Sequence, residues 1–541
     1  MPAMPGGHSP FLRIPPFPGH KGAPLTHTGN SKVDAQEVAA AISAARVGGR
    51  FWGAQPDVSD DLIILAPDSA NQLQAMLALL GKGRACAAIA PGMSLPGHCQ
   101  RLPTDCDPWH LASTASEIWA GADQELALIT GLNGTPLRLF GQGRFVGCDS
   151  APEAALADAI SCWGYSNPFS GENWSAMDAI AQLADWRKLI DANRRIDAVY
   201  GVAGWKRVTL DALLWDGSSP VRHARSFRPV RAVGQHHVAW KSRTSPQLLA
   251  TLADKGVPLG EVEDGFIRSV GLGANCVPPL SAIIDLEGIY FDPSQPSDLE
   301  IILKNTSFSA KTCRRAAALR NRLVEADISK YGQSRNDIKH AAKDRYKVLV
   351  AGQVEDDRSI LTGGSGTANL ELLARARACE PNAHIIYKPH PDVVAGHRKG
   401  HVDPADALRF ADEILDLSIT SLIDAVDAVH VITSLAGFEA LLRGKAVTTH
   451  GVPFYAGWGL TKDLGDVPAR RTRRLSLDEL VAGTLLVYPR YIDPVTRLPC
   501  PAEVLVERMA QGAANISTPL ITLRQWQGRL RALLRHFRGE R

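Results

Sequence analysis

The sequence predicts an α/β fold built from several layers of parallel sheet. Three segments, residues 31–150, 196–345 and 346–480, alternate short β-rich runs with stretches of helical pattern. This alternation is typical of parallel strands covered by helices, because parallel neighbours need a crossover connection. A chain of 541 residues is also too long for one ordinary domain, so we expect roughly two to four domains.

The composition argues against several other classes of protein. Hydrophobic residues make up 45% of the chain and charged residues 21%, which is ordinary for a globular protein. The formal net charge of +3 is too small to indicate a nucleic-acid partner, and no apolar run reaches the roughly 18 residues of a membrane span. The nine cysteines form no CxxC pair and the start of the chain lacks an export signal, so we expect free thiols in a reducing cytoplasm and no metal bound through cysteine.

The two ends of the chain differ in composition from the rest. Residues 1–30 are rich in Pro, Gly and His and lack the apolar core of a signal peptide, so we expect a disordered arm. Residues 521–541 would place Leu523, Trp526 and Leu530 on one arc of a helix that also carries many arginines. Such a basic amphipathic helix either packs on the protein or lies on the cytoplasmic membrane surface.

Residues 31–195 resemble a later part of the same chain. Residues 117–145 align with residues 428–455, and "YSNP" at 165–168 aligns with "YIDP" at 491–494. We interpret residues 31–195 as a degenerate, truncated copy that kept its packing and lost its site; the alternative is chance similarity between β/α units. The copies differ where chemistry is expected, with Gln124 opposite Ser434 and Ile129 opposite Glu439.

The remaining two segments are expected to form the two halves of an enzyme. The first spans residues 196–345 and the second residues 346–520, each with Rossmann-like β/α alternation. Ligands of such sheets bind in the crevice at the carboxyl ends of the strands, so we expect the site in the cleft between the halves.

In the first half, "EVEDGFIRSVGLG" at 261–273 follows a predicted strand. Gly265 allows a sharp turn that exposes the carboxylates of Glu263 and Asp264 before it. A solvated turn without any function explains the same pattern.

In the second half, two motifs indicate an anion site. "IIYKPHPD" at 385–392 ends a strand with Lys388 and His390, and the flanking prolines hold the histidine in extended geometry, where it can bind phosphate or move a proton. In "HVITSLAGFEALLRGKAVTTHG", Thr433 and Ser434 cap a helix whose free N–H groups favour a phosphate, and Glu439 lies one turn along. Plain capping and a loop histidine without a role are the structural alternatives.

These motifs do not match the common nucleotide-binding patterns. Neither GxGxxG nor a P-loop is present, which disfavours NAD and Walker-type ATP binding. The aromatic loop "GVPFYAGWGLT" at 451–461 is suited to closing over a sugar or a base.

The acidic stretch "GQVEDDRSI" at 352–360 stands out most. Glu355, Asp356 and Asp357 follow a strand directly, and three adjacent carboxylates repel one another, so a chain that needed only a turn would rarely place them there.

Taken together, the motifs resemble the capsular polysaccharide β-Kdo transferase family of the KpsC and LipA type. The resemblance covers about residues 196–515 and, more faintly, residues 60–195. It is carried in order by "AVYGVAGWK", "VEDGFIRSVGLG", "PPLSAIIDLEGIYFDPSQPSDLE", "GQVEDDRSI", "YKPHPD", "ITSLAGFEALLRGKAVTTHGVPFYAGWGLT" and "YPRYIDP".

The resemblance implies a GT-B-like pair of Rossmann-like domains and a retaining transfer of Kdo from CMP-β-Kdo to a lipid-linked Kdo acceptor. Retention needs either a double displacement through a carboxylate or a front-face route. The resemblance implies a carboxylate nucleophile, for which we choose Asp357 with Asp356 as the alternative. The resemblance also implies an acid/base in Glu263 or Asp264, phosphate binding by Lys388 and His390, and nucleotide binding by Thr433, Ser434 and Glu439. It calls for no cofactor and no metal.

One departure and two alternatives accompany this resemblance. Relatives with two modules carry two complete transferases, whereas residues 31–195 lack the motifs, so we expect one active site and a partner Kdo transferase or the capsule export machinery alongside it. The alternatives are a non-catalytic capsule-assembly or glycan-binding subunit and a sialyltransferase-like enzyme that uses another CMP-sugar.

Overall fold

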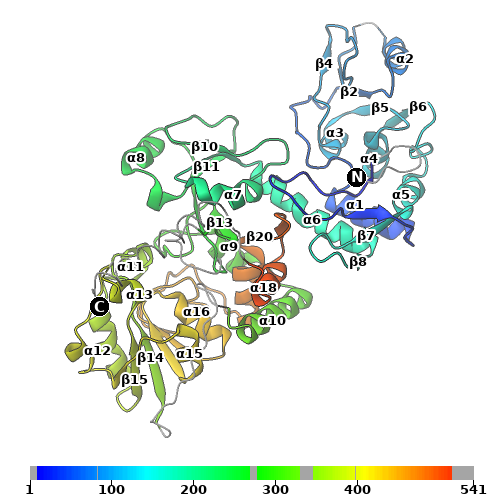
Figure 1. Ribbon diagram of the computed structural model, residues 1–541. Coiled ribbons are helices and arrows are strands. Elements are labelled where there is room, and N and C mark those ends of the chain that lie inside the picture. The colour runs from blue at the N-terminus through cyan, green and yellow to red at the C-terminus, as the bar shows by residue number, and fades with distance from the viewer. Residues whose placement is uncertain (1–8, 82, 268–276, 329–344, 397, 515–541) are drawn as a thin grey trace, which may run out of the picture. The chain divides into compact units, whose positions relative to one another are not determined.

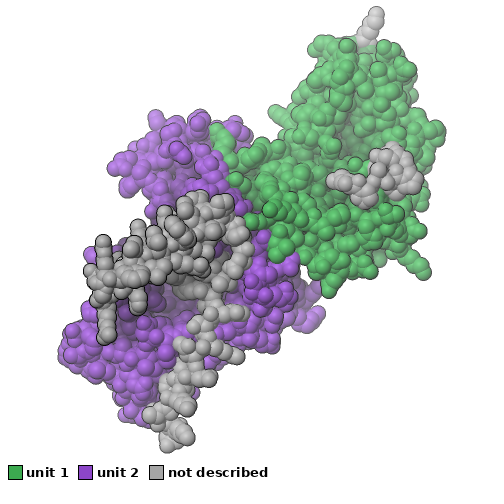
Figure 2. Space-filling view, in the orientation of Figure 1, with its two compact units in different colours: residues 1–197, 211–222, 495–499 green, residues 198–210, 223–494, 500–541 purple. Residues whose placement is uncertain are grey.

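The computed structural model describes residues 9–81, 83–267, 277–328, 345–396 and 398–514, and it confirms the predicted α/β fold. The chain divides into two compact units, coloured separately in Figure 2. Unit 1 comprises residues 1–197, 211–222 and 495–499, and unit 2 comprises residues 198–210, 223–494 and 500–541. The amphipathic helix predicted over residues 521–541 lies outside the described residues.

Unit 1 contains a five-stranded parallel sheet with the strand order β4-β3-β2-β5-β6 (Figure 1). Its strands are β2 (Ile63–Ala66), β3 (Cys86–Ala88), β4 (Cys99–Arg101), β5 (Glu117–Gly121) and β6 (Leu137–Phe140). Three helices of this layer are α2 (Ala70–Leu80), α3 (Pro108–Thr114) and α4 (Glu125–Asn133). The chain passes from the centre to one edge and then returns to the other side, so the order reverses between β2 and β5.

A second layer of unit 1 is a small antiparallel sheet accompanied by helices. Its strands are β1 (Thr26–Thr28), β7 (Trp163–Ser166) and β8 (Asn173–Trp174), and its helices are α1 (Ala35–Ala45), α5 (Pro152–Ser161) and α6 (Ala176–Asn193). Residues 117–193 have the order strand, helix, strand, helix, two strands and helix. Residues 428–510 have the same order with one additional short strand before the second helix.

The prediction of a disordered arm is wrong for residues 9–30. Phe11 and Phe17 are buried, and the ring of Phe17 packs edge-on against Trp186 at 5.7 Å. Strand β1 pairs with β7, and Lys21 donates its backbone N–H to the Thr496 carbonyl at 2.7 Å. The many proline and glycine residues give this segment the composition of a disordered arm. Its scattered aromatic residues nevertheless supply enough apolar surface for packing.

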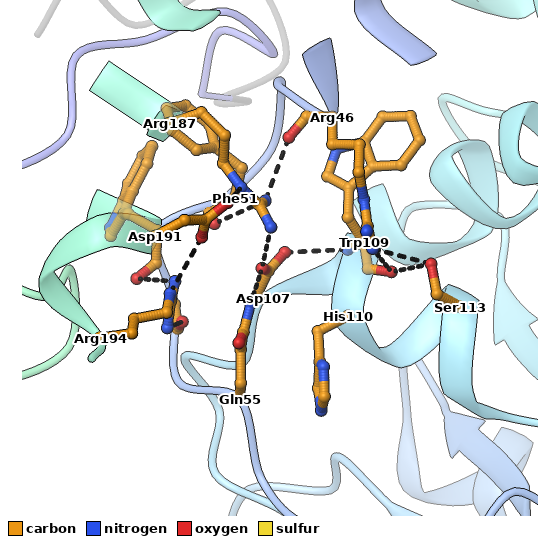
Figure 3. Close-up of polar contacts among 12 residues, drawn as sticks. Arg46, Phe51, Gln55, Asp107, Trp109, His110, Ser113, Arg187, Asp191 and Arg194 are labelled. Atoms are coloured by element: carbon orange, nitrogen blue, oxygen red, sulfur yellow. Dashed lines mark hydrogen bonds and ion pairs between the residues drawn. The ribbon is translucent and has the colours of Figure 1, made fainter. Parts of the chain in front are cut away.

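A buried arginine, Arg187, connects several segments of unit 1 through hydrogen bonds and an ion pair (Figure 3). Arg187 of α6 forms an ion pair with the fully buried Asp107 at 3.0 Å and donates to the Phe51 carbonyl at 3.1 Å. Asp107 also accepts hydrogen bonds from the backbone N–H of Trp109 at 3.0 Å and from the side chain of Gln55 at 2.9 Å. A buried ion pair is stable only when its remaining donors and acceptors are satisfied, and this pair meets that condition.

Unit 2 begins with a mixed sheet of seven strands in the order β10-β9-β11-β12-β13-β20-β21. The strands are β9 (Ile196–Tyr200), β10 (Arg222–Ala224), β11 (His236–Ala239), β12 (Leu259–Asp264), β13 (Ser281–Asp285), β20 (Arg490–Ile492) and β21 (Pro499–Cys500). β11 and β12 are parallel, whereas β13 is antiparallel to both β12 and β20, so this layer is not purely parallel. Residues 490–492, which the sequence places in the second half, join the sheet of the first half.

The second sheet of unit 2 has six parallel strands in the order β16-β15-β14-β17-β18-β19. Its strands are β14 (Lys347–Ala351), β15 (His384–Lys388), β16 (Glu413–Ile414), β17 (Ala428–Val431), β18 (Ala446–Thr449) and β19 (Lys462–Asp463). When these six strands are numbered 1 to 6 along the chain, their order in the sheet is 3-2-1-4-5-6, the strand order of a Rossmann fold. The order reverses between β14 and β17, and the crevice at their carboxyl ends is where such sheets bind ligands.

Helices surround these two sheets. The first half carries α7 (Arg207–Leu213), α8 (Pro246–Asp254), α9 (Asp298–Asn305) and α10 (Ala310–Glu325). The second half carries α11 (Arg358–Gly363), α12 (Asn369–Cys379), α13 (Pro391–Val394), α14 (Pro404–Ala407), α15 (Ile419–Asp424) and α16 (Leu435–Leu442). The chain continues through α17 (Leu477–Val481), a π-helical turn (Ala482–Val487) and α18 (Ala502–Ala510). Of the helices in the described ranges, none has both the length and the apolar character needed to span a bilayer.

Two histidines are buried together within the six-stranded layer. Nδ1 of His430 on β17 lies 3.0 Å from Nε2 of His450, which follows β18. Burial and the nearby charge of Lys462 lower the pKa of His430 to about 3. Burial and the charges of Arg375 and Lys462 lower the pKa of His450 to about 4, against a smaller opposite effect of Glu371. Both rings are therefore neutral in the folded protein at neutral pH.

We expect the stability of unit 2 to fall as the pH drops below about 6.5, the ordinary pKa of histidine. Below that pH the unfolded chain takes up protons that the folded chain excludes, which lowers the free energy of unfolding by roughly 1.4 kcal/mol per pH unit for each ring. Denaturant unfolding at several pH values measures this slope. His430→Gln should flatten it, whereas His401→Gln, at an exposed position, should not; equal slopes for all three proteins would contradict the assignment.

Candidate active site

The carboxyl edge of the six-stranded sheet gathers the second-half motifs. β14 and β15 are in register with Ala351 opposite Lys388, and Gly352 donates its backbone N–H to the Lys388 carbonyl at 2.9 Å. A side chain at Gly352 would meet the Tyr387 hydroxyl at 2.8 Å, so this close approach requires glycine. The acidic stretch and the Lys388–His390 segment therefore leave the sheet side by side.

Gln353 joins the acidic stretch to the turn after β17. Its Oε1 accepts the backbone N–H groups of Ile432 at 3.2 Å, Thr433 at 2.9 Å and Ser434 at 3.0 Å. Its Nε2 donates to Oγ1 of Thr433 at 3.1 Å, and Asn369 binds both backbone groups of Gln353. This role of Gln353 was not predicted from the sequence; its place directly after a strand, just before three acids, is the signal that could have indicated one.

The three adjacent carboxylates diverge to three separate partners. Glu355 accepts the backbone N–H of Asn369 at 2.8 Å, and Asp356 forms an ion pair with Arg398 at 3.1 Å. Asp357 caps α11 and accepts hydrogen bonds from the Ser359 backbone N–H at 3.0 Å and hydroxyl at 2.8 Å. Arg398 offsets the charge of Asp356, and the hydrogen bonds stabilise the other two carboxylates, against the mutual repulsion expected from the sequence. Asp357 is exposed and fixed in orientation.

Lys388 and His390 lie at the end of β15. Lys388 is buried, and its Nζ donates to Asp416 at 3.3 Å. His390 caps α13, and its Nδ1 accepts the backbone N–H of Asp392 at 3.2 Å. A neutral imidazole that accepts at Nδ1 carries its proton at Nε2, so this ring presents a donor at Nε2.

The turn after β17 leads into the helix predicted from the sequence. Ser434 caps α16 as expected and accepts the Ala436 N–H at 3.2 Å. Just before the helix, Gln353 accepts the backbone N–H groups of Thr433 and Ser434. Glu439 is buried within α16. An anion at this helix would therefore meet the hydroxyls of Thr433 and Ser434 and the dipole of α16, but not the N–H groups of these two residues.

The acids of the first half are tied to the second half through Arg358. This residue directly follows Asp357, and its guanidinium binds Glu261 of β12, two positions before Glu263. Burial acts to lower the pKa of Arg358, but its hydrogen bonds to Glu261 and the charge of Glu263 raise it overall. Asp264 at the end of β12 forms an ion pair with Lys206 at 3.0 Å. The sequence motif contains all three acids and a role was predicted only for Glu263 and Asp264; Glu261 is fully buried.

An aromatic cluster, defined here as Phe266, Phe438 and Phe454, joins three motifs. Phe266 follows Gly265, Phe438 lies on α16 and Phe454 lies in the loop at 451–461. Their ring centroids are 4.9 Å (Phe266–Phe454), 5.2 Å (Phe438–Phe454) and 6.2 Å (Phe266–Phe438) apart. The sequence suggested that this loop closes over a ligand, which is wrong for its aromatic rings: Phe454, Tyr455 and Trp458 are buried and form part of the core.

The structure therefore brings most of the predicted residues to one region. Only some of them are in direct contact. Ser359, which binds Asp357, receives a hydrogen bond from Thr433 at 3.4 Å, so the acidic stretch and the α16 turn are in contact. Lys388 and His390 flank this pair along the sheet edge. Glu263 and Asp264 lie on β12, and Arg358 connects this strand to the acidic stretch by binding Glu261. In the described part of the chain, no group of three or more His, Cys, Asp and Glu side chains is arranged to hold a metal ion.

The equivalent crevice of unit 1 is filled by its own side chains. Asp68, after β2, accepts a hydrogen bond from the Gln124 side chain at 2.8 Å and from the Asp123 backbone N–H at 3.3 Å. A side chain at Gly121 would collide with the Asp68 carboxylate at 2.0 Å. Gln124 precedes α4 as Ser434 precedes α16, so a carboxylate of the protein occupies the place where a ligand anion would approach the helix.

We expect Gln124→Ala to leave the activity of unit 2 unchanged and to lower stability by about 1 kcal/mol, the usual cost of one hydrogen bond. The variant Gln353→Ala also removes a side-chain amide, in unit 2, and should lower activity because it releases the turn at Thr433 and Ser434. Ile129 is fully buried in α4, so Ile129→Val should likewise lower stability without any change in activity. Turnover and thermal unfolding distinguish the cases; loss of turnover at Gln124 with unchanged melting would show that unit 1 has a working site.

Comparisons with known proteins match the part of the chain that contains these residues. The family model described as "Capsule polysaccharide biosynthesis protein" matches residues 236–337 and 314–491. The "Capsule polysaccharide modification protein LipA" of Neisseria meningitidis serogroup A / serotype 4A is 43% identical over 350 residues, which cover 63% of this chain and 49% of the relative. The "Lipopolysaccharide-processing protein LpsZ" of Rhizobium meliloti is 42% identical over 306 residues, 54% of this chain and 69% of the relative.

Two solved structures from Thermosulfurimonas dismutans also match. The KpsC β-Kdo 2,7-transferase is 34% identical, with a TM-score of 0.46, and the KpsC β-Kdo 2,4-transferase is 29% identical, with a TM-score of 0.49. Each match covers 58% of this chain and 98% of the solved chain. This chain spans about half the length of the LipA relatives it matches.

Proposed function

Because the chain belongs to the family of capsule polysaccharide biosynthesis proteins, we propose that it is a retaining glycosyltransferase that transfers Kdo from CMP-β-Kdo to a lipid-linked Kdo acceptor. The observation that carries this proposal is the meeting of an oriented carboxylate, a lysine–histidine pair and a helix N-terminus at the carboxyl edge of the six-stranded sheet. The choice of Kdo and CMP follows from the resemblance of the motifs.

In the first step, a carboxylate oxygen of Asp357 attacks the anomeric carbon of the donor sugar. A bond forms between Asp357 and the sugar, and the bond from the sugar to the CMP phosphate breaks, with the electron pair leaving on the phosphate. Lys388 and the Nε2–H of His390 stabilise the growing negative charge, and the dipole of α16 acts in the same direction. Ser359 keeps the carboxylate of Asp357 in one orientation.

In the second step, Glu263 or Asp264 takes the proton of the acceptor hydroxyl. The hydroxyl oxygen attacks the same carbon from the opposite face, and the ester to Asp357 breaks, which restores the carboxylate. Two inversions give net retention. Arg358 binds β12 while directly following Asp357, so the nucleophile and the acid/base pair belong to segments that are fixed to each other.

The test is to incubate the protein with a short Kdo glycolipid and with either CMP-Kdo or CMP-sialic acid. We expect a product that is one Kdo longer, detected by mass spectrometry, with the anomeric configuration of the donor retained by NMR. Transfer from CMP-sialic acid alone would instead indicate a sialyltransferase-like enzyme. Binding of the glycolipid without transfer from either donor would indicate a non-catalytic subunit.

The proposal includes a cellular setting. A lipid-linked acceptor requires work at the inner face of the cytoplasmic membrane, as a peripheral protein. Since the crevice of unit 1 is filled by Asp68, one chain provides one linkage, and a partner Kdo transferase or the capsule export machinery would act on the product.

A further inference from the structure

An exposed loop connects β10 and β11 in unit 2 (Figure 1). Residues 225–235, "RSFRPVRAVGQ", are called the cationic loop here. It contains three arginines and no acid, and the surrounding residues 217–253 contain no Asp or Glu at all. Its arginines, Arg225, Arg228 and Arg231, recur at every third position.

The same loop exposes apolar side chains. Val233 has a relative exposure of 105%, and Phe227 of 36%. A turn produces the first of these: Gln235 donates its backbone N–H to the Ala232 carbonyl at 3.3 Å, and Gly234 has a φ of +80°, so Val233 lies at the apex. A turn that needed only to connect two strands would rarely present valine at its most exposed position.

The sheet register places the cationic loop away from the proposed active site. β11 begins after the loop and runs parallel to β12, with His237 opposite Leu259 and Ala239 opposite Glu261. The acids at the carboxyl end of β12 therefore lie at the far end of these strands from the loop. We therefore assign the charge of the loop to a contact other than the reacting end of a substrate.

We infer that the cationic loop docks the protein on an anionic phospholipid surface. Arginines bind lipid phosphates while the apolar residues between them enter the boundary between headgroups and acyl chains, a combination typical of interfacial segments. A soluble polyanion would use the arginines but gains little from Val233. The inference does not depend on the transferase reaction, because vesicle binding involves no transfer.

The test is co-sedimentation of the full chain with vesicles of phosphatidylcholine alone or mixed with phosphatidylglycerol. We expect binding to the anionic vesicles that weakens as salt is added. Arg225→Gln combined with Arg228→Gln should weaken binding roughly thirtyfold, since each basic residue near such a surface contributes about 1 kcal/mol. Arg314→Gln combined with Arg409→Gln removes the same charge from exposed positions elsewhere and should change binding little.

Val233→Ser isolates the apolar part of the contact and should weaken vesicle binding roughly tenfold without any change in charge. Thermal unfolding should be unchanged in all these surface variants. Three results would overturn the inference. One is vesicle binding by the Arg225/Arg228 variant within twofold of the unaltered protein. Another is an equal loss in the matched control. The third is full competition by soluble polyglutamate together with no effect of Val233→Ser, which would assign the loop to a soluble polyanion.

Discussion

Asp357→Asn is expected to abolish sugar transfer while leaving the fold intact. An amide does not form the glycosyl ester, and removal of a catalytic group of this kind typically costs roughly a thousandfold or more in rate. The asparagine keeps the oxygen that accepts the two hydrogen bonds from Ser359, so α11 should remain capped. The rate of transfer to the Kdo glycolipid measures the loss of activity. Thermal unfolding of the same sample measures whether the fold is intact.

Asp356→Asn is the matched control for this variant. It removes the neighbouring charge and its exposed ion pair with Arg398, which should cost little activity or stability. If Asp356→Asn is the inactive variant and Asp357→Asn turns over normally, the nucleophile is Asp356. If both variants remain active, the double-displacement mechanism is wrong.

His390→Ala is expected to reduce both donor binding and turnover, by on the order of a hundredfold in rate. The imidazole donates to charge that develops on the leaving phosphate, and the loss of one such donor typically costs a factor of this size. Donor binding is measured by calorimetry with CMP-Kdo, and turnover with the Kdo glycolipid.

Because His390 also caps α13, a second variant separates catalysis from folding. His390→Asn retains an acceptor for the Asp392 N–H but lacks the imidazole, so it should resemble His390→Ala in rate and the unaltered protein in melting. His401→Ala, at an exposed position further along the chain, should retain full activity. Unchanged binding and turnover in both His390 variants would place this histidine outside the site.

The sequence was most informative where short-range pattern decides the structure. The apolar runs before Gly352 and before Pro389 are strands because Val348, Val350, Ile385 and Tyr387 are buried in a sheet covered on both faces. Parallel strands end at one edge, so residues that follow such runs had to lie near each other. The predicted grouping of the acidic stretch with Lys388, His390 and Ser434 at that edge follows from this rule alone.

Features that depend on distant partners could not be predicted in this way. Gln353 binds a turn 80 residues away, and Arg358 binds an acid 97 residues away, so the sequence around each residue does not indicate its partner. The burial of Phe17 depends on Trp186 and Trp215, which no periodicity in the first thirty residues reveals. The fine roles of Asp357 and Glu263 stay predictions, because they concern a reaction rather than a contact.

The return of β20 to the first sheet of unit 2 affects how the protein can be divided for experiments. β20 pairs with β13, so a fragment that ends near residue 345 would leave the edge of β13 unpaired and open to aggregation. A fragment that begins near residue 346 and runs to the C-terminus would carry β20 without its partner. Separate production of the donor-binding half therefore requires a fragment limited to residues 346–480. Alternatively, this fragment is co-expressed with the first half, to which residues 490–510 are attached through an added linker.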